Sequence, residues 1–165
     1  MGVVMKKMIY RLDKSFKLEL MQSRDLTSLK FLCQDIEKLS YLYPNIKHWY
    51  WHIFAQGFLG NEREIVCVYD NSNNELAGFA LLKRAMLEKK ICTFYILPEY
   101  RESGLGHKFF PIIVDLLGMK DIGITVSESV NVSLQPLLNH NNFEFEKLEN
   151  GLYLPGKKEI IYKLY

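Results

Sequence analysis

A glycine-rich turn between an apolar strand and an apolar helical run is the part of the sequence best suited to bind an anion. Residues 90–97 are β-branched and aromatic and end at Pro98, and an apolar run follows at 109–117. Gly104 and Gly106 lie between them. The first N–H groups of a helix have no partner inside the helix, and the helix dipole adds about half a positive charge there. The turn is therefore predicted to bind a phosphate group.

The neighbours of the two glycines favour this interpretation. Arg101, His107 and Lys108 add positive charge, and a side chain at either glycine would crowd a ligand or prevent the required backbone angles. A dinucleotide-binding fingerprint requires a third Gly or Ala near Phe109, and a P-loop requires Gly-Lys-Ser or Gly-Lys-Thr; the sequence has neither. A tight turn that only packs a helix against a sheet remains the alternative without a ligand.

Four side chains elsewhere are candidates for proton transfer. His52, Glu128 and His140 are candidate general bases, and Tyr95 is a candidate proton donor. Each also has an ordinary explanation: an exposed helix histidine, a solvated loop carboxylate, a cation at a helix C-terminus and an aromatic ring packed on a strand. We take Tyr95, Glu128 and His52 as the catalytic candidates.

Nucleophilic cysteine and metal chemistry are less favoured. Cys92, Phe94 and Ile96 occupy every second position of the predicted strand, which predicts that the three share one side. No histidine is near Cys92 in sequence, and a buried structural thiol is the commoner state. His48 and His52 have the spacing of two zinc ligands on a helix, but no Glu follows His48 and no third ligand is apparent. No metal site is predicted.

The elements expected to position these residues form an α/β domain with a mixed sheet. The pattern gives the order βααβββαβαββ. A polar turn at 70–74 joins the second and third strands as a hairpin. The expected strands are 16–20, 64–69, 75–84, 90–97, 121–126, 143–148 and 159–165, and the expected helices are 26–39, 46–59, 109–117 and 133–140, with Ser23 and Asp25 as candidate caps before the first helix.

Length and composition indicate one globular domain spanning residues 1–165. A chain of 165 residues is the size of a single domain, and 48% hydrophobic with 24% charged residues is typical of a packed core rather than of disorder. The formal net charge is +2 and the Lys and Arg residues are scattered, so no nucleic-acid or membrane partner is expected.

A cytoplasmic location is expected. No window approaches the ~20 apolar residues of a membrane span, and residues 1–10 lack the apolar stretch of a signal peptide. Lys6 stands where a myristoylation signal needs Ser or Thr. The three cysteines are far apart in sequence and are expected to be reduced.

The strand and turn resemble the acetyl-CoA motif of GNAT N-acetyltransferases. The run Tyr95-Ile96-Leu97-Pro98-Glu99-Tyr100-Arg101-Glu102-Ser103-Gly104-Leu105-Gly106 matches an apolar strand ending near a proline, then Arg or Gln, two variable residues, Gly, any residue, and Gly or Ala. A second match follows, where Asn131 precedes the segment from Leu137 to Phe143 and aligns with the family's Asn and its Leu-Tyr-x-x-x-Gly-Phe helix. The resemblance covers roughly residues 64–145.

The resemblance implies a fold, an activity and a set of cofactor contacts. The implied fold is a mixed, mostly antiparallel central sheet of six to seven strands flanked by about four helices. The implied activity is direct transfer of an acetyl group from acetyl-CoA to a primary amine. In that family a bulged strand pairs with the pantetheine arm, and the glycine turn holds the pyrophosphate. The matching cofactor-binding residues are Phe94, Tyr95, Ile96, Arg101, Glu102, Ser103, Gly104, Leu105, Gly106, His107 and Asn131.

Some positions depart from the family pattern. The tyrosine that often protonates the departing CoA thiolate corresponds to Leu138, and the glycine before the final Phe corresponds to Asn142. The glutamate that several members carry on the strand is missing from 90–97, although Glu88 lies just before it. A catalytically weak acyl-CoA-binding sensor or interaction domain is therefore an alternative. An aminoacyl-tRNA-acetylating toxin is disfavoured by the near-neutral charge.

The acceptor is not indicated by the sequence. The segment 41–59 is the most aromatic part of the chain, and in GNAT-like domains it borders the acceptor pocket. Most of these rings are expected to pack on the sheet, and the rest are suited to an apolar or cationic acceptor group. The oligomeric state, monomer or homodimer, is also left open. The aromatic residues are Tyr41, Tyr43, Trp49, Tyr50, Trp51, Phe54 and Phe58.

Overall fold

The structure is a computed structural model that describes residues 9–165. Within that range, eight strands form one sheet in the order β1-β2-β3-β4-β5-β6-β8-β7. The expectations about a signal peptide and myristoylation concern mainly residues 1–8, which lie outside the described residues. The strands are β1 (Ile9–Arg11), β2 (Phe16–Leu20), β3 (Arg63–Asp70), β4 (Leu76–Arg84), β5 (Lys89–Ile96), β6 (Ile122–Ser127), β7 (Glu144–Asn150) and β8 (Lys158–Leu164).

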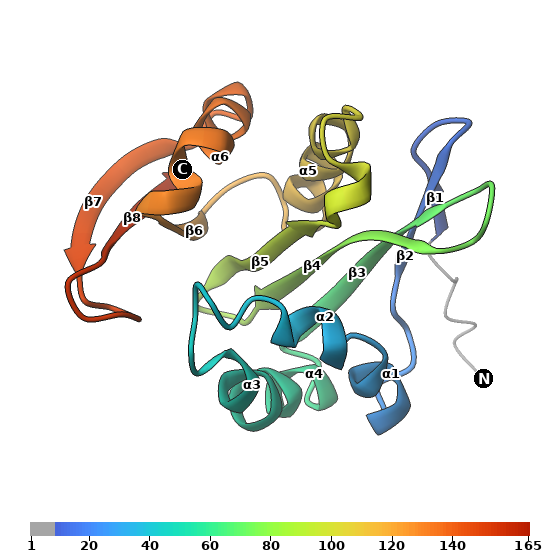
Figure 1. The fold of residues 1–165 in the computed structure, drawn as a ribbon, viewed down its shortest axis with the longest axis horizontal. Helices are drawn as coiled ribbons and strands as arrows, with labels where there is room; N and C mark the ends of the chain where they lie inside the picture. The colour runs from blue at the N-terminus through green and yellow to red at the C-terminus, as the bar shows by residue number, and fades with distance from the viewer. Residues whose placement is uncertain (1–8) are drawn as a thin grey trace.

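The helices cover both faces of the sheet (Figure 1). Helices α1 to α4 lie on one face, and α5 and α6 lie on the other. No helix in the described part of the chain is long and apolar enough to cross a membrane. The helices are α1 (Leu26–Phe31), α2 (Cys33–Glu37), α3 (Ile46–Trp49), the π-helical turn η1 (Tyr50–Phe54), α4 (Ala55–Leu59), the 3₁₀ turn η2 (Pro98–Tyr100), α5 (Leu105–Leu116) and α6 (Glu128–His140).

The predicted mixed, mostly antiparallel sheet is confirmed. Each neighbouring pair of strands is antiparallel except β5 and β6, which are parallel. Strand β1 adds an edge strand that the sequence pattern did not indicate, because it is only three residues long. The parallel pair is joined by α5, as a parallel connection requires a crossover.

Two apolar clusters lie on the two faces of the sheet. Side chains alternate across a strand, so Val66 and Val68 of β3 join the cluster under α5, while Ile65 and Cys67 join the cluster over α1–α4. Because both faces of the central strands are covered, β3 is apolar through its middle without an inside-outside pattern.

All four predicted helices differ from the observed ones in detail, and α5 begins at Leu105, four residues before the predicted start. The segment 26–39 forms two short helices that break at Leu32, and the Asp25 side chain caps the first by accepting a hydrogen bond from the Ser28 N–H at 2.9 Å. The segment 46–59 is helical throughout but contains the π-helical turn. Helix α6 begins at Glu128, five residues before the predicted start, so this carboxylate lies in a helical first turn and not in a loop.

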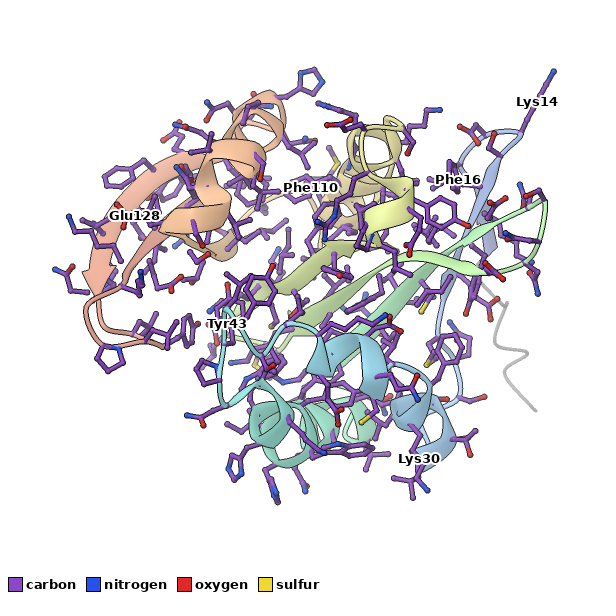
Figure 2. The ribbon with its side chains drawn as sticks, in the orientation of Figure 1. Lys14, Phe16, Lys30, Tyr43, Phe110 and Glu128 are labelled. Carbon is purple, nitrogen blue, oxygen red and sulfur yellow. The ribbon has the colours of Figure 1, made fainter. Side chains whose placement is uncertain are left out.

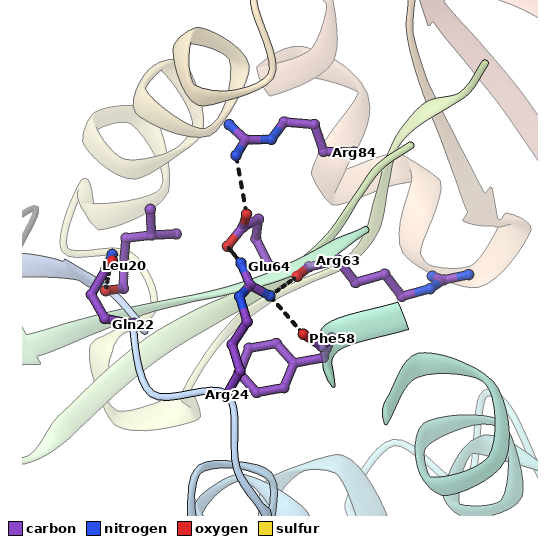
Figure 3. A network of polar contacts seen from close by, with 7 residues as sticks. All are labelled: Leu20, Gln22, Arg24, Phe58, Arg63, Glu64 and Arg84. Carbon is purple, nitrogen blue, oxygen red and sulfur yellow. Dashed lines mark hydrogen bonds and ion pairs between the residues drawn. The ribbon is translucent and has the colours of Figure 1, made fainter. Parts of the chain in front are cut away.

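A buried polar network joins the loop before α1 to β3 and β4 (Figure 3). The Glu64 side chain is only 6% exposed and accepts from Arg24 Nη2 at 2.8 Å and from Arg84 Nη2 at 3.1 Å. Arg24 Nη1 also donates to the main-chain oxygens of Phe58 and Arg63, each at 2.7 Å. One guanidinium therefore connects the end of α4 to the start of β3.

Replacing the central arginine of this network is expected to destabilise the fold. Arg24→Met leaves the buried carboxylate with one half-exposed partner and two carbonyl oxygens without a donor, so we expect a loss of about 3 kcal/mol in the free energy of unfolding. Urea denaturation measures it. The double variant Arg24→Met/Glu64→Met should recover part of the loss. A change below about 0.5 kcal/mol in the single variant would show that the network contributes little to stability.

Candidate active site

Strands β5 and β6 separate along their length and leave one edge of β5 open. They pair only where Lys89–Ile91 meet Ile122–Ile124, after which β6 continues beside β8 as far as Ser127. Beyond Ile91, β5 is paired only on its β4 side within the described residues. A cleft of about 680 Å³ lies along this edge. The main-chain groups of β5 beyond Ile91 are therefore available to a ligand that lies between β5 and β6.

The N-terminus of α5 closes one end of the cleft. Gly104 precedes the helix with a φ of +80°, in the left-handed region that favours glycine, and a Cβ atom there would meet nothing within 4 Å. A Cβ at Gly106 would meet only Leu137 Cδ2, at 3.9 Å. Within residues 9–165, the main-chain N–H groups of Gly106 and His107 have no protein acceptor. Open space in front of unpaired donors is the arrangement that suits a phosphate group.

Arg101 and Lys108, the two permanent cations near this turn, have different partners. Arg101 Nε donates to the main-chain oxygen of Ile96 at 3.0 Å, and its guanidinium lies 5.3 Å from the Tyr95 ring centroid, so the arginine is held beside the cleft. Lys108 instead forms an ion pair with Asp13, in the turn between β1 and β2. Arg101 thus lies beside the cleft, and the charge of Lys108 is already partly neutralised by a carboxylate.

Strand β5 contains a β-bulge at Cys92. Leu81 lies opposite Thr93 and Leu82 lies opposite Ile91, so Cys92 is an extra residue in the pairing with β4. The prediction that Cys92 shares one side with Phe94 and Ile96 is wrong for this reason. Cys92 packs with the cluster over α1–α4, whereas the other two pack under α5.

The environment of the Cys92 thiol does not favour a nucleophilic role. Burial raises its pKa, and the positive charge of Arg63 offsets this only in part. The protonated thiol is therefore the stable form at neutral pH, whereas the thiolate is the reactive form. A structural role for Cys92 follows from this.

A second cavity of about 410 Å³ lies on the α3 side of the sheet. It is bordered by Trp49 and Ile53 of the helical segment and by charged residues of β3, β4 and β5. Four residues line both cavities, so the two spaces meet beside them. Two ligands, one in each cavity, would come together at this junction. The four residues are Tyr43, Cys92, Thr93 and Thr125.

Tyr43 is the junction residue that carries a phenolic hydroxyl group. It lies in the loop before α3 (Figure 2), and its ring packs against Tyr153 at 5.2 Å between centroids. Burial raises the pKa of its phenol far above the ordinary value, and electrostatic interactions with the nearby side chains of Glu159 and Tyr153 raise it further. The hydroxyl therefore stays protonated at neutral pH and is a hydrogen-bond donor. In the sequence Tyr43 is one aromatic among several, and no motif marks it.

The structure brings one of the three catalytic candidates to the cleft. Tyr95 lines it from β5, with its ring tilted against Phe79 at 5.5 Å. Glu128 is exposed at the start of α6 (Figure 2) and borders neither cavity. His52 is exposed, stacks on His48 at 4.3 Å and also borders neither cavity. Among residues 9–165, no cluster of His, Cys, Asp and Glu suits a metal ion.

The downstream motif residues are mainly structural. Asn131 Oδ1 accepts a hydrogen bond from the Tyr162 hydroxyl at 2.7 Å, which ties α6 to β8. Leu138 is fully buried in the core under α5 and α6, and a leucine has no hydroxyl group to offer to the cleft. Asn142 has a φ of +63°, the left-handed conformation that a glycine would supply and that asparagine tolerates. The turn is thus preserved without the glycine.

Strand β8 carries a buried carboxyl group, that of Glu159, near Tyr43. Glu159 is 1% exposed, and within the described residues its Oε2 atom has no hydrogen-bond partner. Burial raises the pKa of this carboxyl group. The folded protein therefore favours the protonated form. The stability that the protonated Glu159 side chain contributes is fully present below the unfolded pKa of about 4.3. It is lost as pH rises through the higher pKa of the folded state.

Glu159→Gln is expected to remove this pH dependence. The variant keeps the shape but carries no charge, so its melting temperature should exceed that of the wild type at pH 8 and should match it more closely at pH 5. Thermal unfolding at the two pH values measures the difference. Glu144→Gln, at an exposed position on β7, is the control. An equal shift at both pH values would contradict a raised pKa at Glu159.

Comparison with known proteins gives the family. The model described as Acetyltransferase (GNAT) family matches residues 30–110, a segment that contains β5 and the glycine turn. Among curated proteins, none matches the chain in sequence.

Several solved structures share the fold. A GNAT-family acetyltransferase described as putative, from Desulfovibrio desulfuricans, superposes with a TM-score of 0.67 at 14% identity, over 89% of this chain and 98% of that one. Spermidine N-acetyltransferase from Vibrio cholerae, in complex with CoA and spermine, gives 0.66 at 15% identity, over 92% and 96%. The ribosomal-protein-S18-alanine N-acetyltransferase from Escherichia coli gives 0.63 at 19% identity, over 89% and 92%. With its open β5 edge and its family-model match, this chain belongs to the GNAT superfamily of acetyltransferases.

Proposed function

We propose that this chain is an acetyl-CoA-dependent N-acyltransferase that moves an acetyl group directly to a primary amine. The observation that carries the proposal is the single cleft that joins the open edge of β5 to the N-terminus of α5 and meets a second cavity at Tyr43 and Thr93. Family membership supports it. The proposal includes the expected cytoplasmic location and a single domain acting as a monomer or homodimer.

The cleft has a suitable group for each part of the cosubstrate. The main-chain N–H groups between Glu102 and His107, with Arg101 beside them, would hold the pyrophosphate. The open edge at Phe94–Ile96 would pair with the amides of the pantetheine arm. Acetyl-CoA supplies an activated thioester when it is bound. The junction residues would then hold the acceptor amine within reach of the thioester.

The transfer itself needs little from the protein beyond positioning. The amine nitrogen forms a C–N bond to the acetyl carbon, the thioester C–S bond breaks, and one amine proton ends on the CoA sulfur. Holding the two reactants together contributes about 7–11 kcal/mol in favourable cases. Tyr43 is the protonated hydroxyl at the junction, and we assign it to donate a hydrogen bond to the group that gains negative charge.

The sensor alternative is favoured by two features: Leu138, a buried side chain without a hydroxyl group, stands where the family often has a tyrosine, and residues 90–97 contain no glutamate. Calorimetry with acetyl-CoA followed by an assay for free CoA thiol separates the two functions. The transferase predicts binding and thiol release with at least one amine, peptide or aminoacyl-tRNA. Binding without thiol release on any acceptor would support the sensor, and absence of binding would remove both.

A further inference from the structure

The second cavity carries positive charge that the protein does not neutralise. Lys83 is paired with Glu88 at its edge. Two further cations line the cavity, Arg63 of β3 and Lys90 of β5. Within the part of the chain that the structure describes, neither has a carboxylate oxygen at ion-pair distance. The cavity therefore has an excess of two positive charges.

The Arg63 side chain is held in one position by its neighbours. Its stem passes directly over Gly57 of α4, where a Cβ atom would lie only 2.6 Å from Arg63 Cδ. The guanidinium lies 5.8 Å from the ring centroids of both Trp49 and Phe54. Figure 3 shows the side chain directed away from the Glu64 network. A guanidinium fixed in this way loses little conformational freedom when a ligand binds.

The hydrogen-bonding capacity of Arg63 is largely unused. Its Nη1 atom donates to Cys92 Sγ at 3.4 Å, and sulfur is a weak acceptor. A guanidinium has five N–H donors in a planar fork that matches a carboxylate or a phosphate. The contact also places Arg63 next to a residue of the junction between the two cavities. A group bound by Arg63 would therefore lie close to the reacting amine.

We propose that the acceptor amine carries an anionic group, a carboxylate or a phosphate, which Arg63 binds with help from Lys90. The inference rests on the proposed function, because it assumes that the second cavity receives the acceptor. A volume of about 410 Å³ suits a small acidic amine or the first residues of an acidic peptide. Polyamines are disfavoured, since their charges would be repelled. The aromatic residues here thus support the arginine rather than a cationic acceptor.

Matched acceptor pairs test the preference. The peptides Glu-Ala-amide and Gln-Ala-amide differ by one carboxylate, and phosphoethanolamine and ethanolamine differ by one phosphate. We expect kcat/KM, measured by release of free CoA thiol, to be at least about tenfold higher for the anionic member of one pair. The pair that shows the difference identifies whether the site takes a carboxylate or a phosphate. Equal values in both pairs would overturn the proposal and leave the transferase function standing.

Variants at the cavity test the assignment to Arg63. Arg63→Met should lower the anionic-to-neutral ratio of kcat/KM about 10- to 100-fold, mainly through KM. Lys90→Met should lower it several-fold and serves as the second variant if Arg63→Met does not fold. Arg84→Met is the matched control, because Arg84 lies outside both cavities. An undiminished ratio in folded Arg63→Met and in Lys90→Met would contradict the assignment.

A binding measurement separates this proposal from the proposed function. Calorimetry with CoA present should show tighter binding of the anionic acceptor to the wild type than to Arg63→Met. If that difference is found but no thiol is released with acetyl-CoA, the anion site stands and the transferase function is wrong. If thiol is released but the anionic acceptor binds no tighter than its neutral partner, the anion site is wrong and the transferase function stands.

Discussion

Gly106→Val is expected to weaken acetyl-CoA binding by more than about 100-fold while the domain stays folded. In the free protein a Cβ at this position would only touch Leu137 Cδ2 at 3.9 Å, so the fold has room for the side chain. That room is the space that the proposed pyrophosphate would occupy in front of the helix N-terminus. Losing two charge-assisted hydrogen bonds, at about 1.5 kcal/mol or more each, corresponds to this factor. Isothermal titration calorimetry measures the affinity.

A matched pair of glycines separates binding from backbone strain. Gly104 and Gly156 have φ values of +80° and +73°, and a Cβ at either would meet nothing within 4 Å. Valine should therefore cost each about the same stability, roughly 1–2 kcal/mol. Only Gly104→Val should lose CoA affinity, because Gly156 lies in the loop between β7 and β8. Wild-type affinity in both Gly104→Val and Gly106→Val would remove the turn from the site.

Tyr43→Phe is expected to lower kcat about 100-fold with little change in CoA affinity. The substitution removes the protonated hydroxyl at the junction of the two cavities and keeps the ring that packs on Tyr153. Removing one preorganised donor to a developing negative charge typically costs 10²- to 10³-fold, and we take about 100-fold here. Steady-state thiol release and calorimetry measure the two quantities. A kcat within about threefold of the wild type would show that Tyr43 has no part in the chemistry.

Tyr95→Phe is the comparison variant. Tyr95 borders only the larger cleft, and its ring lies between Phe79 and the Arg101 guanidinium. We therefore expect a smaller effect on kcat than at Tyr43. If Tyr95→Phe is the slower of the two enzymes, the proton-donor role proposed from the sequence belongs to Tyr95, and the assignment to Tyr43 is wrong.

The glycine turn and the elements that flank it were predictable because their signals are local. A β-branched strand, a proline and two glycines follow one another in the chain, and the observed β5 and α5 flank the turn as the pattern indicated. Main-chain donors at a helix start and the left-handed angle at Gly104 depend on the residues immediately around them. The roles of the predicted cofactor-binding and catalytic residues themselves remain predictions.

The second cavity was not predictable because distant segments form it. Tyr43 reaches the junction from a loop, and its partner Tyr153 comes from the far end of the chain. Arg63 becomes a candidate ligand only because Gly57 leaves space for its stem. The bulge at Cys92 also reverses which side of the strand this residue faces, and strict alternation could not reveal it.

A crystal structure of the protein with CoA tests the central claim most directly. The account predicts that the diphosphate contacts the main-chain N–H groups between Glu102 and His107 and that the pantetheine arm lies along the open edge of β5, with its sulfur near Tyr43. CoA bound elsewhere, with the space between β5 and β6 left unchanged, would contradict it.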